Sequence, residues 1–304
     1  MNNEVVNTLK VKYPVGEEDY QKALNTIIVS ETAGIYPSKN PVVTILGAQP
    51  GAGKTEIQRI TQEAYQGNIV VCNADNLRAF YPRALELNRL HPKEFPLLTS
   101  DFAHRLKDGL QAHCLKHGFS FSLETTFKNP NDLNEMMDTY TKAGFQTDIK
   151  LLAVNRLISR LYTEKRYEDM YQLEGAGRNV PKQAHDEREK ALTPTVEGVI
   201  KANKFRNMSL YKRAIVTSES SIRSGVSLLA ENPPDALNTF KEEKNRPLTD
   251  QERYFYKNVA EQVLFQKQQR NATFVEIFAF KMEFNDLLTQ KQQQIDKSLN
   301  KGIG

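Results

Sequence analysis

The chain has 304 residues, of which 39% are hydrophobic and 26% are charged, which is enough for one large domain or for one domain with an appendage. Its 41 basic and 37 acidic residues leave a net charge of only +4, which gives no support for nucleic-acid binding. There is no apolar run of about 20 residues and no signal-peptide pattern, and the two cysteines lack metal-ligand spacing. We therefore expect a cytoplasmic protein, of the producing or of a target cell, with reduced thiols and no membrane partner.

The first segment, residues 1–40, is expected to be helical and peripheral. Over residues 17–28 four apolar residues recur at the spacing of one helix face: Tyr20, Ala23, Leu24 and Ile27. Two prolines then close the segment, at positions 37 and 41.

From residue 41 to residue 216 the chain alternates short apolar strands with helices. Strands are predicted over 42–46, 69–72, 119–123, 146–154, 208–211 and 214–216. Helices are predicted over 54–66, 100–116, 130–144 and 155–171. A polar loop is expected over 172–186, and a further helix follows it to about residue 204. Short strands between helices are typical of a parallel sheet covered on both faces. We therefore predict an α/β fold whose ligands bind at the carboxyl ends of the strands.

The loop after the first predicted strand reads Ala-Gln-Pro-Gly-Ala-Gly-Lys-Thr over residues 48–55. Small residues between a strand and a helix let backbone N–H groups approach phosphate oxygens, and the helix N-terminus adds positive charge. Lys54 can reach the outer phosphates of a nucleoside triphosphate, and the Thr55 hydroxyl can ligate magnesium. We assign ATP binding to Gln49, Pro50, Gly51, Ala52, Gly53, Lys54, Thr55 and Glu56, with Thr55 as the ligand of Mg²⁺. A glycine-rich turn without a ligand is the competing interpretation, and the order of strand, glycines, Lys-Thr and helix disfavours it.

Two more strand ends carry polar residues, over residues 73–78 and 124–126. Asp75 and Glu124 should therefore converge near a bound triphosphate. Transfer of a phosphoryl group to a hydroxyl needs a carboxylate that accepts the hydroxyl proton and cations that neutralise the transition state. Asp75 is the candidate base, and Arg166 and Arg178 are the candidate cations.

Each of these residues also has a plain structural interpretation. Asp75 could cap the helix that follows its strand, and Glu124 could cap the next turn. Arg166 lies in a stretch rich in charge, as a solvated helix face would, and Arg178 could be plain loop surface. His185 and Asp186 could form a hydrolytic dyad, although a packed, hydrogen-bonded pair is the more ordinary interpretation.

The combination of several short segments changes this balance. These are residues 48–55, Asp75-Asn76-Leu77-Arg78 with Tyr81-Pro82, Leu123-Glu124-Thr125-Thr126, Arg166-Tyr167-Glu168 with Met170-Tyr171, Arg178, and Pro181-Lys182-Gln183-Ala184-His185-Asp186. With them the chain resembles the zeta toxin family, the P-loop kinases of bacterial toxin–antitoxin systems, from about residue 42 to residue 211. The Arg-Tyr-Glu and Pro-Lys-Gln-Ala-His-Asp segments are far more specific than the phosphate loop.

The resemblance implies that ATP and Mg²⁺ are used to phosphorylate a hydroxyl of the amino sugar of UDP-N-acetylglucosamine, which blocks cell-wall precursor synthesis. By the same resemblance, Lys54 and Thr55 hold the phosphates and the metal, and Asp75 activates the sugar hydroxyl. Arg166 and Arg178 would stabilise the transferring phosphoryl group. The residues expected to contact the sugar nucleotide are Asp75, Arg78, Glu124, Thr125 and Thr126.

The chain departs from the family pattern in three places. Leu77 stands where an aromatic residue is common, and the loop between Arg166 and Arg178 is about one residue short. Residues 217–304 have no obvious counterpart and are expected to form a helical C-terminal extension. This extension could recognise a partner such as an antitoxin protein, or could inhibit the kinase in cis.

Two other functions remain open at this point. One is a P-loop kinase that acts on another small molecule, such as an antibiotic, a nucleoside or another sugar nucleotide; this would preserve Lys54 and Asp75 but not the Arg-Tyr-Glu segment. The other is a nucleotide-dependent regulatory binding module. Asp75 argues against the module, because a switch needs no base aimed at an acceptor hydroxyl.

Overall fold

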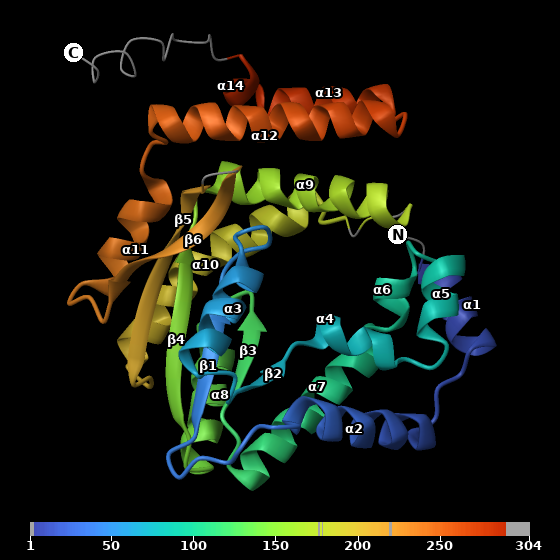
Figure 1. The fold of residues 1–304 in the computed structure, drawn as a ribbon, viewed down its shortest axis with the longest axis vertical. Coiled ribbons are helices and arrows are strands. Elements are labelled where there is room, and N and C mark those ends of the chain that lie inside the picture. The colour runs from blue at the N-terminus through green and yellow to red at the C-terminus, as the bar shows by residue number, and fades with distance from the viewer. Residues whose placement is uncertain (1–2, 176, 178, 219–220, 290–304) are drawn as a thin grey trace. The chain divides into compact units, whose positions relative to one another are not determined.

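The computed structural model describes residues 3–175, 177, 179–218 and 221–289. It divides the chain into two compact units, residues 1–246 and residues 247–304. The first unit contains every strand and most of the helices in the described part of the chain (Figure 1). Its elements are α1 (Asn3–Lys12), α2 (Glu17–Thr32), β1 (Val42–Gly47), α3 (Lys54–Ala64), β2 (Val70–Cys72), α4 (Ala74–Leu77), η1 (Arg78–Phe80), α5 (Ala84–Leu90), α6 (Phe95–Leu98), α7 (Ser100–His117), β3 (Phe121–Thr125), α8 (Pro130–Lys142), β4 (Gln146–Ala153), α9 (Arg156–Glu174), α10 (Lys182–Ala202), β5 (Asn207–Ser218), β6 (Ser221–Glu231) and α11 (Ala236–Asn245).

The six strands form one sheet in the order β2-β3-β1-β4-β5-β6. All neighbours are parallel except β5 and β6, which are antiparallel. The register pairs Cys72 with Leu123 and Leu46 with Glu124, so β1, β2 and β3 end at the same edge of the sheet. The predicted α/β fold with a parallel sheet flanked by helices is confirmed, and its strand ends bring the predicted polar segments together.

The burial of the strands and helices follows from their sequence patterns. Every residue of β1 is buried, as expected for a central strand covered on both faces. On α7 the buried residues recur at helical spacing through Leu106 and Leu110, and the helix ends at Gly118 with φ of +75°. Cys72 and Cys114 are buried and form no disulfide. These elements share one apolar core beneath the strand ends.

The N-terminal helices belong to this core rather than to its periphery. On α2 the predicted face is confirmed, because Tyr20, Ala23 and Ile27 are buried. Leu9 of α1 also belongs to the core. α2 packs along α7, next to β2 (Figure 1). The expectation of a peripheral segment is therefore wrong.

The region between α9 and α11 differs most from prediction. The expected polar loop over 172–186 is shorter, because α9 continues to Glu174 and α10 begins at Lys182. The two short strands expected near 208–216 are one long strand, β5, and residues 221–231 form β6 where helix was expected. Alternating apolar residues such as Val226 and Leu228 favour a strand there, but the sequence over 217–222 contains no glycine or asparagine of the kind that usually marks a hairpin.

The second unit is helical in its described residues. It contains α12 (Asp250–Gln269), α13 (Phe274–Glu283) and α14 (Asn285–Leu288), and α12 packs against the other two. The helical extension expected from the sequence is interrupted between α12 and α13, where Asn271 has φ of +56° and Thr273 caps α13 in a capping box with Glu276. No helix among the residues that the structure describes is both long and apolar enough to cross a membrane.

Candidate functional site

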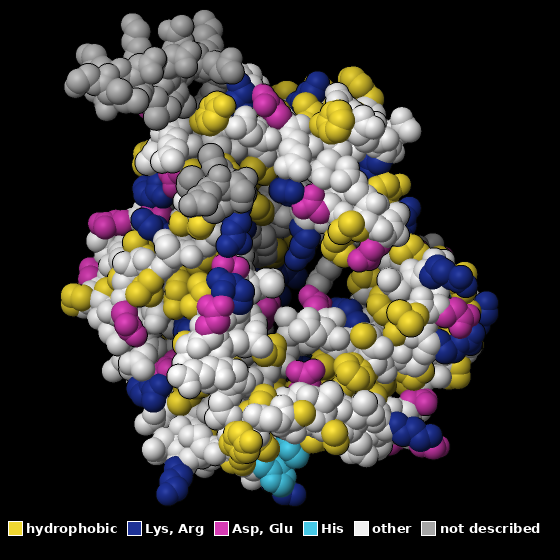
Figure 2. All heavy atoms as spheres, viewed as in Figure 1, with side chains coloured by type: hydrophobic (Ala, Val, Ile, Leu, Met, Phe, Trp, Pro, Cys, Tyr) yellow, Lys and Arg dark blue, Asp and Glu magenta, His cyan; other side chains and the backbone are white. Residues whose placement is uncertain are grey.

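A cavity of about 760 Å³ lies at the edge where β1, β2 and β3 end. Its walls come from the loop after β1, the segments after β2 and β3, and residues of α7, α9, α10 and β5. In Figure 2 the surface is hollowed near the centre of the view, with Lys and Arg side chains inside the hollow. All residues that line this cavity belong to the first compact unit.

The loop after β1 has the geometry of a phosphate cradle. Gly51 and Gly53 have φ of +76° and +110°, a region that favours glycine. A Cβ atom on Gly51 would lie 2.0 Å from the carbonyl oxygen of Ser159, so only glycine fits against α9 there. α3 begins directly after Gly53 without a side-chain cap. This helix N-terminus and the two glycines fit a bound triphosphate, because backbone N–H groups can approach its oxygens.

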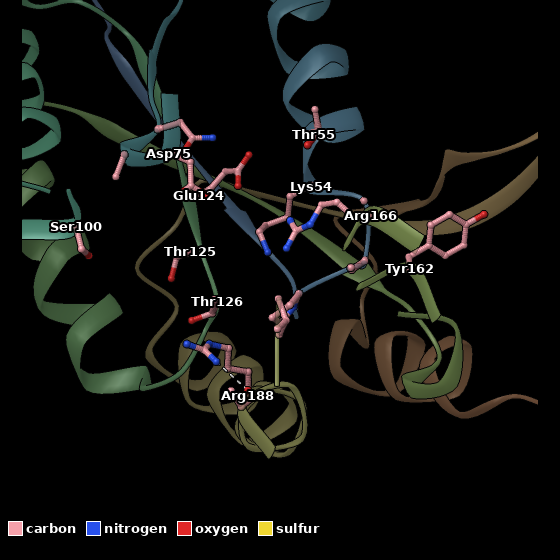
Figure 3. Close-up of a pocket in the computed structure, with 18 of the residues that line it drawn as sticks. Lys54, Thr55, Asp75, Ser100, Glu124, Thr125, Thr126, Tyr162, Arg166 and Arg188 are labelled. Carbon is pink, nitrogen blue, oxygen red and sulfur yellow. Dashed lines mark hydrogen bonds between the residues drawn. The ribbon is translucent and has the colours of Figure 1, made fainter. Parts of the chain in front are cut away.

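Lys54 and Thr55 line the cavity at the start of α3. The Lys54 ammonium donates to the carbonyl oxygens of Ala48, at 3.0 Å, and Gln49, at 3.4 Å, and its side chain points into the cavity (Figure 3). No three His, Cys, Asp or Glu residues of the described chain are grouped to hold a metal. A Mg²⁺ ion at Thr55 fits this surrounding, because magnesium takes few protein ligands and shares phosphate oxygens and water.

Asp75 lies in the first turn of α4 and lines the same cavity as Lys54. The side chain of Asn73, not that of Asp75, caps this helix, since its Oδ1 accepts from the Asp75 N–H at 2.9 Å. The Asp75 carboxylate instead pairs with the Nε of Arg78 at 3.1 Å and keeps 48% of its side chain exposed. The helix-cap interpretation of Asp75 is therefore wrong, and its carboxylate is available to the cavity.

Arg78 is held in place behind Asp75. Its side chain is 13% exposed, and its Nη1 donates to Thr99 Oγ1 at 2.9 Å and to the carbonyl of Pro96. A guanidinium anchored in this way can orient the Asp75 carboxylate, and it also lines the cavity.

Glu124, Thr125 and Thr126 line the cavity where β3 ends. Glu124 lines the same cavity as Asp75 (Figure 3). The Thr125 Oγ1 accepts from the N–H of Phe127 at 3.2 Å, which fixes the turn after the strand. Two carboxylates and two hydroxyls from neighbouring strand ends thus line the same cavity as the phosphate loop.

Three predicted residues have other outcomes. Gln49 and Glu56 are not among the residues that line the cavity. Gln49 is fully buried behind the loop. Glu56 pairs with Arg59 along α3, and this hydrogen bond holds the pKa of the Glu56 carboxyl below its ordinary value. Arg166, on α9, does line the cavity and points into it (Figure 3), whereas Arg178 lies outside the described residues.

Several residues of the cavity were missed from the sequence. Ser100, His104 and Lys107 come from one face of α7, and their i, i+4, i+7 spacing is the signal that could have identified them. Arg188 enters from α10. Lys107, Arg166 and Arg188 add positive charge to a cavity suited to phosphorylated ligands.

Arg213 on β5 is another cavity residue that was missed. Its guanidinium lies 3.6 Å from the ring centroid of Tyr162, on α9, and its Nη2 donates to the carbonyl oxygen of Gly51 at 2.8 Å. Its Nη1 donates to Ser224 on β6 at 2.6 Å. Burial raises the pKa of Tyr162 above its ordinary value. The β5–β6 hairpin thus reaches the phosphate loop, and no local sequence pattern announces this contact.

Comparisons with known proteins agree with this arrangement. The family model described as Zeta toxin matches residues 26–222, which is more than half of the chain. Among curated relatives, the Toxin PezT of Streptococcus pneumoniae is 28% identical over 219 residues, covering 71% of this chain and 87% of that protein. The Toxin zeta of Streptococcus pyogenes is 27% identical over 209 residues, covering 68% of this chain and 73% of that protein.

Two solved structures share the fold. The structure of the PezAT chromosomal toxin–antitoxin system of Streptococcus pneumoniae matches with a TM-score of 0.67 and 23% identity, covering 91% of this chain and all of that one. The AvrRxo1-ORF1:-ORF2 complex with ATP matches with a TM-score of 0.54 and 12% identity, covering 86% of this chain and 84% of that one. The similarity thus extends beyond the segment that the family model matches.

Proposed function

Because this chain belongs to the zeta toxin family, we propose that it is a kinase that transfers the terminal phosphoryl group of ATP to a sugar hydroxyl of UDP-N-acetylglucosamine. The modified sugar nucleotide would then block cell-wall precursor synthesis. One observation carries the proposal: Lys54, from the phosphate loop, and Asp75, from the neighbouring strand end, line one cavity of about 760 Å³. A cavity of this size can hold a nucleotide and an acceptor.

The donor nucleotide occupies the side of the cavity formed by the loop after β1. Residues Gly51 to Lys54 surround its phosphates with backbone N–H groups, and the Lys54 ammonium moves from the loop carbonyls to the phosphate oxygens. Thr55 would hold Mg²⁺, and the ion would neutralise charge on the phosphates. The structure determined with ATP for the AvrRxo1-ORF1:-ORF2 complex, which shares the fold, is consistent with ATP as donor.

The acceptor occupies the side formed by the ends of β2 and β3. Asp75 accepts the proton of the sugar hydroxyl, and Arg78 keeps the carboxylate in position. Glu124, Thr125 and Thr126 provide hydrogen-bond partners for the sugar and its nucleotide. Because these groups stand at fixed strand ends, the hydroxyl can be held in line with the phosphate loop.

Arginines neutralise the charge that develops on the transferring group. Arg166 points into the cavity and is the first candidate, and Arg188 lines it as well (Figure 3). Arg178 remains a prediction from the family pattern. A single arginine in this role contributes on the order of a thousandfold to the rate.

We also propose that an antitoxin protein restrains the kinase. The structural relative from Streptococcus pneumoniae is described as part of the PezAT toxin–antitoxin system. A kinase that depletes a cell-wall precursor needs restraint in the cell that makes it. The C-terminal unit, residues 247–304, is a candidate for the segment that a partner recognises or that inhibits the kinase in cis.

Mass spectrometry of UDP-N-acetylglucosamine after incubation with the protein, ATP and Mg²⁺ tests the reaction. We expect a product heavier by one phosphoryl group, and no product when ATP is omitted. The Lys54→Ala variant, which lacks the phosphate-binding ammonium, serves as the inactive control. If the sugar nucleotide stays unmodified while a nucleoside or an aminoglycoside is phosphorylated, the acceptor assignment is wrong and the kinase acts on another small molecule. If ATP binds but no acceptor is modified, the chain is a binding module.

A further inference from the structure

A buried chain of hydrogen bonds lies behind the phosphate loop and links it to α9 and α10. It runs from Gln49 through Ser159 to His185, and each of these three residues has 0% of its surface exposed. The Gln49 Nε2 lies 3.3 Å from Ser159 Oγ, and Ser159 Oγ lies 3.0 Å from His185 Nε2. The His185 Nδ1 in turn lies 3.3 Å from the carboxylate of Asp186.

The chemistry of the end groups assigns a direction to this chain. Gln49 Nε2 can only donate, and it also donates to the carbonyl oxygen of Val154 at 2.8 Å. The Asp186 carboxylate can only accept, so His185 carries its proton on Nδ1 and accepts from the Ser159 hydroxyl through Nε2. The Ser159 hydroxyl oxygen then accepts from Gln49. The carbonyl oxygen of Arg156, at 3.0 Å, is a second acceptor for the same Ser159 hydroxyl proton. The neutral ring thus satisfies every donor in the chain.

Ser159, His185 and Asp186 have the connectivity of a hydrolytic triad, but they cannot serve as one. None of the three lines the cavity, and Ser159 and His185 are fully buried. Asp186 is engaged by Arg156 at 2.7 Å and Lys182 at 3.2 Å. No substrate carbonyl can reach the Ser159 hydroxyl, so the packed, hydrogen-bonded interpretation of the His-Asp pair accounts for the geometry.

The chain ends instead on the phosphate loop. Gln49 lies two residues before Gly51. Only the hydrogen bonds of its Nε2 orient its side-chain amide, because its buried Oε1 has no hydrogen-bond partner among the described residues. Ser159 touches the loop a second time, since its carbonyl oxygen lies 2.0 Å from where a Cβ on Gly51 would be. On the other side, α10 carries His185 between Ala184 and Arg188, which both line the cavity.

We propose that His185 is a positioning residue that holds the phosphate loop through Ser159 and Gln49 and thereby fixes the loop relative to α10. The loop backbone is then rigid before a ligand arrives, which reduces the cost of ordering it on binding. The role of this rigidity in phosphoryl transfer rests on the proposed function, but the rigidity itself does not.

Hydrogen–deuterium exchange of the full chain without ligand tests the proposal directly. We expect the Ser159→Ala and His185→Ala variants to exchange the backbone amides in residues 49–54, apart from Pro50, which has none, about tenfold faster than the wild type, as loss of one link would predict. His185→Gln should restore much of the protection, because its amide oxygen can accept from Ser159.

Thr195→Ala is the matched control. Thr195 is buried on the same helix, and its hydroxyl donates to the carbonyl oxygen of Ala191 at 2.7 Å. This variant should lower the thermal midpoint of unfolding without changing exchange at residues 49–54. Ser159→Ala removes only one oxygen, so it remains informative if His185→Ala does not fold. Unchanged exchange at residues 49–54 in Ser159→Ala would overturn the proposal.

A binding titration with ATP and Mg²⁺ separates this proposal from the proposed function. If the wild type binds ATP, Ser159→Ala and His185→Ala should raise the Kd about tenfold, and His185→Gln should raise it less. If the wild type binds no ATP, the proposed function is wrong, and the exchange measurement still decides the role of His185. An unchanged Kd together with unchanged exchange would leave His185 with a packing role alone, against the proposal.

Discussion

At the scale of single residues, the proposed reaction depends most on the carboxylate of Asp75. The Asp75→Asn variant keeps the shape of the side chain but cannot accept the hydroxyl proton. We expect the transfer rate to fall by about 10²–10⁴-fold, the usual contribution of a general base, while the Kd for ATP changes by less than about threefold, since no loop contact is lost. Steady-state kinetics with UDP-N-acetylglucosamine and an ATP titration measure the two effects.

Asp101→Asn provides the control for this experiment. Asp101 lies on α7 outside the cavity lining and pairs with Lys10 at the surface, at 2.9 Å. Its loss should leave the rate unchanged, because exposed ion pairs contribute little. Wild-type activity in Asp75→Asn would remove the base from the mechanism.

The buried pair of His185 and Asp186 makes stability depend on pH. Burial lowers the pKa of His185 below its ordinary value of 6.5. The hydrogen bond to Asp186 acts against burial and raises this pKa, whereas the charges of Arg160 and Arg156 lower it further. The native protein therefore binds fewer protons at this ring than the unfolded chain does. The His185 contribution to stability is present above pH 6.5 and is lost as the pH falls below that value.

Asp186 acts in the same direction at lower pH. Its burial raises the pKa, but hydrogen bonds from Arg156, His185 and Lys182 outweigh this and hold the pKa well below 3.8, so its contribution is lost only in strong acid. We predict that the free energy of unfolding in urea falls between pH 7 and pH 5, and that His185→Gln shows a smaller fall. His113→Gln is the comparison, because burial also lowers the pKa of His113. An equal fall in wild type and His185→Gln would contradict the prediction.

How well a residue could be predicted depended on where its signal lies. Asp75 and Glu124 follow apolar strands directly, so the rule that ligands meet at strand ends placed both at one cavity. Gln49 belongs to the loop motif and Glu56 follows it directly, but the motif does not specify which side chains turn away from the ligand. Arg213 lies 162 positions after Gly51 in the sequence. Only the pairing of distant strands brings Arg213 to the loop.

At the scale of elements, the β5–β6 hairpin contacts the phosphate loop through Arg213. Arg213→Met keeps an unbranched side chain but loses the hydrogen bonds to Gly51 and Ser224 and the stacking on Tyr162. Hydrogen bonds that involve a charged group contribute about 1.5–3 kcal/mol, so we expect the Kd for ATP to rise about tenfold or more. Equilibrium titration with a fluorescent ATP analogue measures the change.

Lys212→Met is the matched control on the same strand. Successive residues of a strand point to opposite faces, and Lys212 is not among the residues that line the cavity. The control should bind ATP like the wild type. If both variants bind normally, the hairpin contributes packing but does not position the loop.

Elements were predictable where one local pattern dominates, and less so where distant contacts decide. β1 and α7 were predicted closely because an unbroken apolar run and a helical period leave few alternatives. β6 was missed because its strand pairing depends on β5 rather than on a hairpin signal. The break after α12 has no strong local signal, because it depends on a positive φ at Asn271, which asparagine tolerates but does not require.

At the scale of the whole chain, the expected boundaries differ from those of the compact units. The sequence divides at a change of composition near residue 217, whereas the first unit continues to Arg246 because β6 completes the sheet and α11 packs against β4 and β5. The N-terminal segment likewise joins the core of this unit. A domain boundary follows the packing of the core, and a change in composition indicates it only approximately.

This division predicts how the chain responds to truncation after Arg246. The sheet, its core and all residues that line the cavity belong to residues 1–246, so we expect the truncated chain to unfold cooperatively and to bind ATP with a Kd within about threefold of the full chain. Truncation after Val216 removes β6 and the Ser224 partner of Arg213, exposes the edge of β5 and should give an unstable or aggregating protein. Thermal unfolding and ATP titration of the three chains compare these outcomes. If the chain truncated after Arg246 loses its cooperative transition, residues 247–304 are needed for the fold. If that chain instead has normal stability and a faster transfer rate, residues 247–304 are an inhibitory segment.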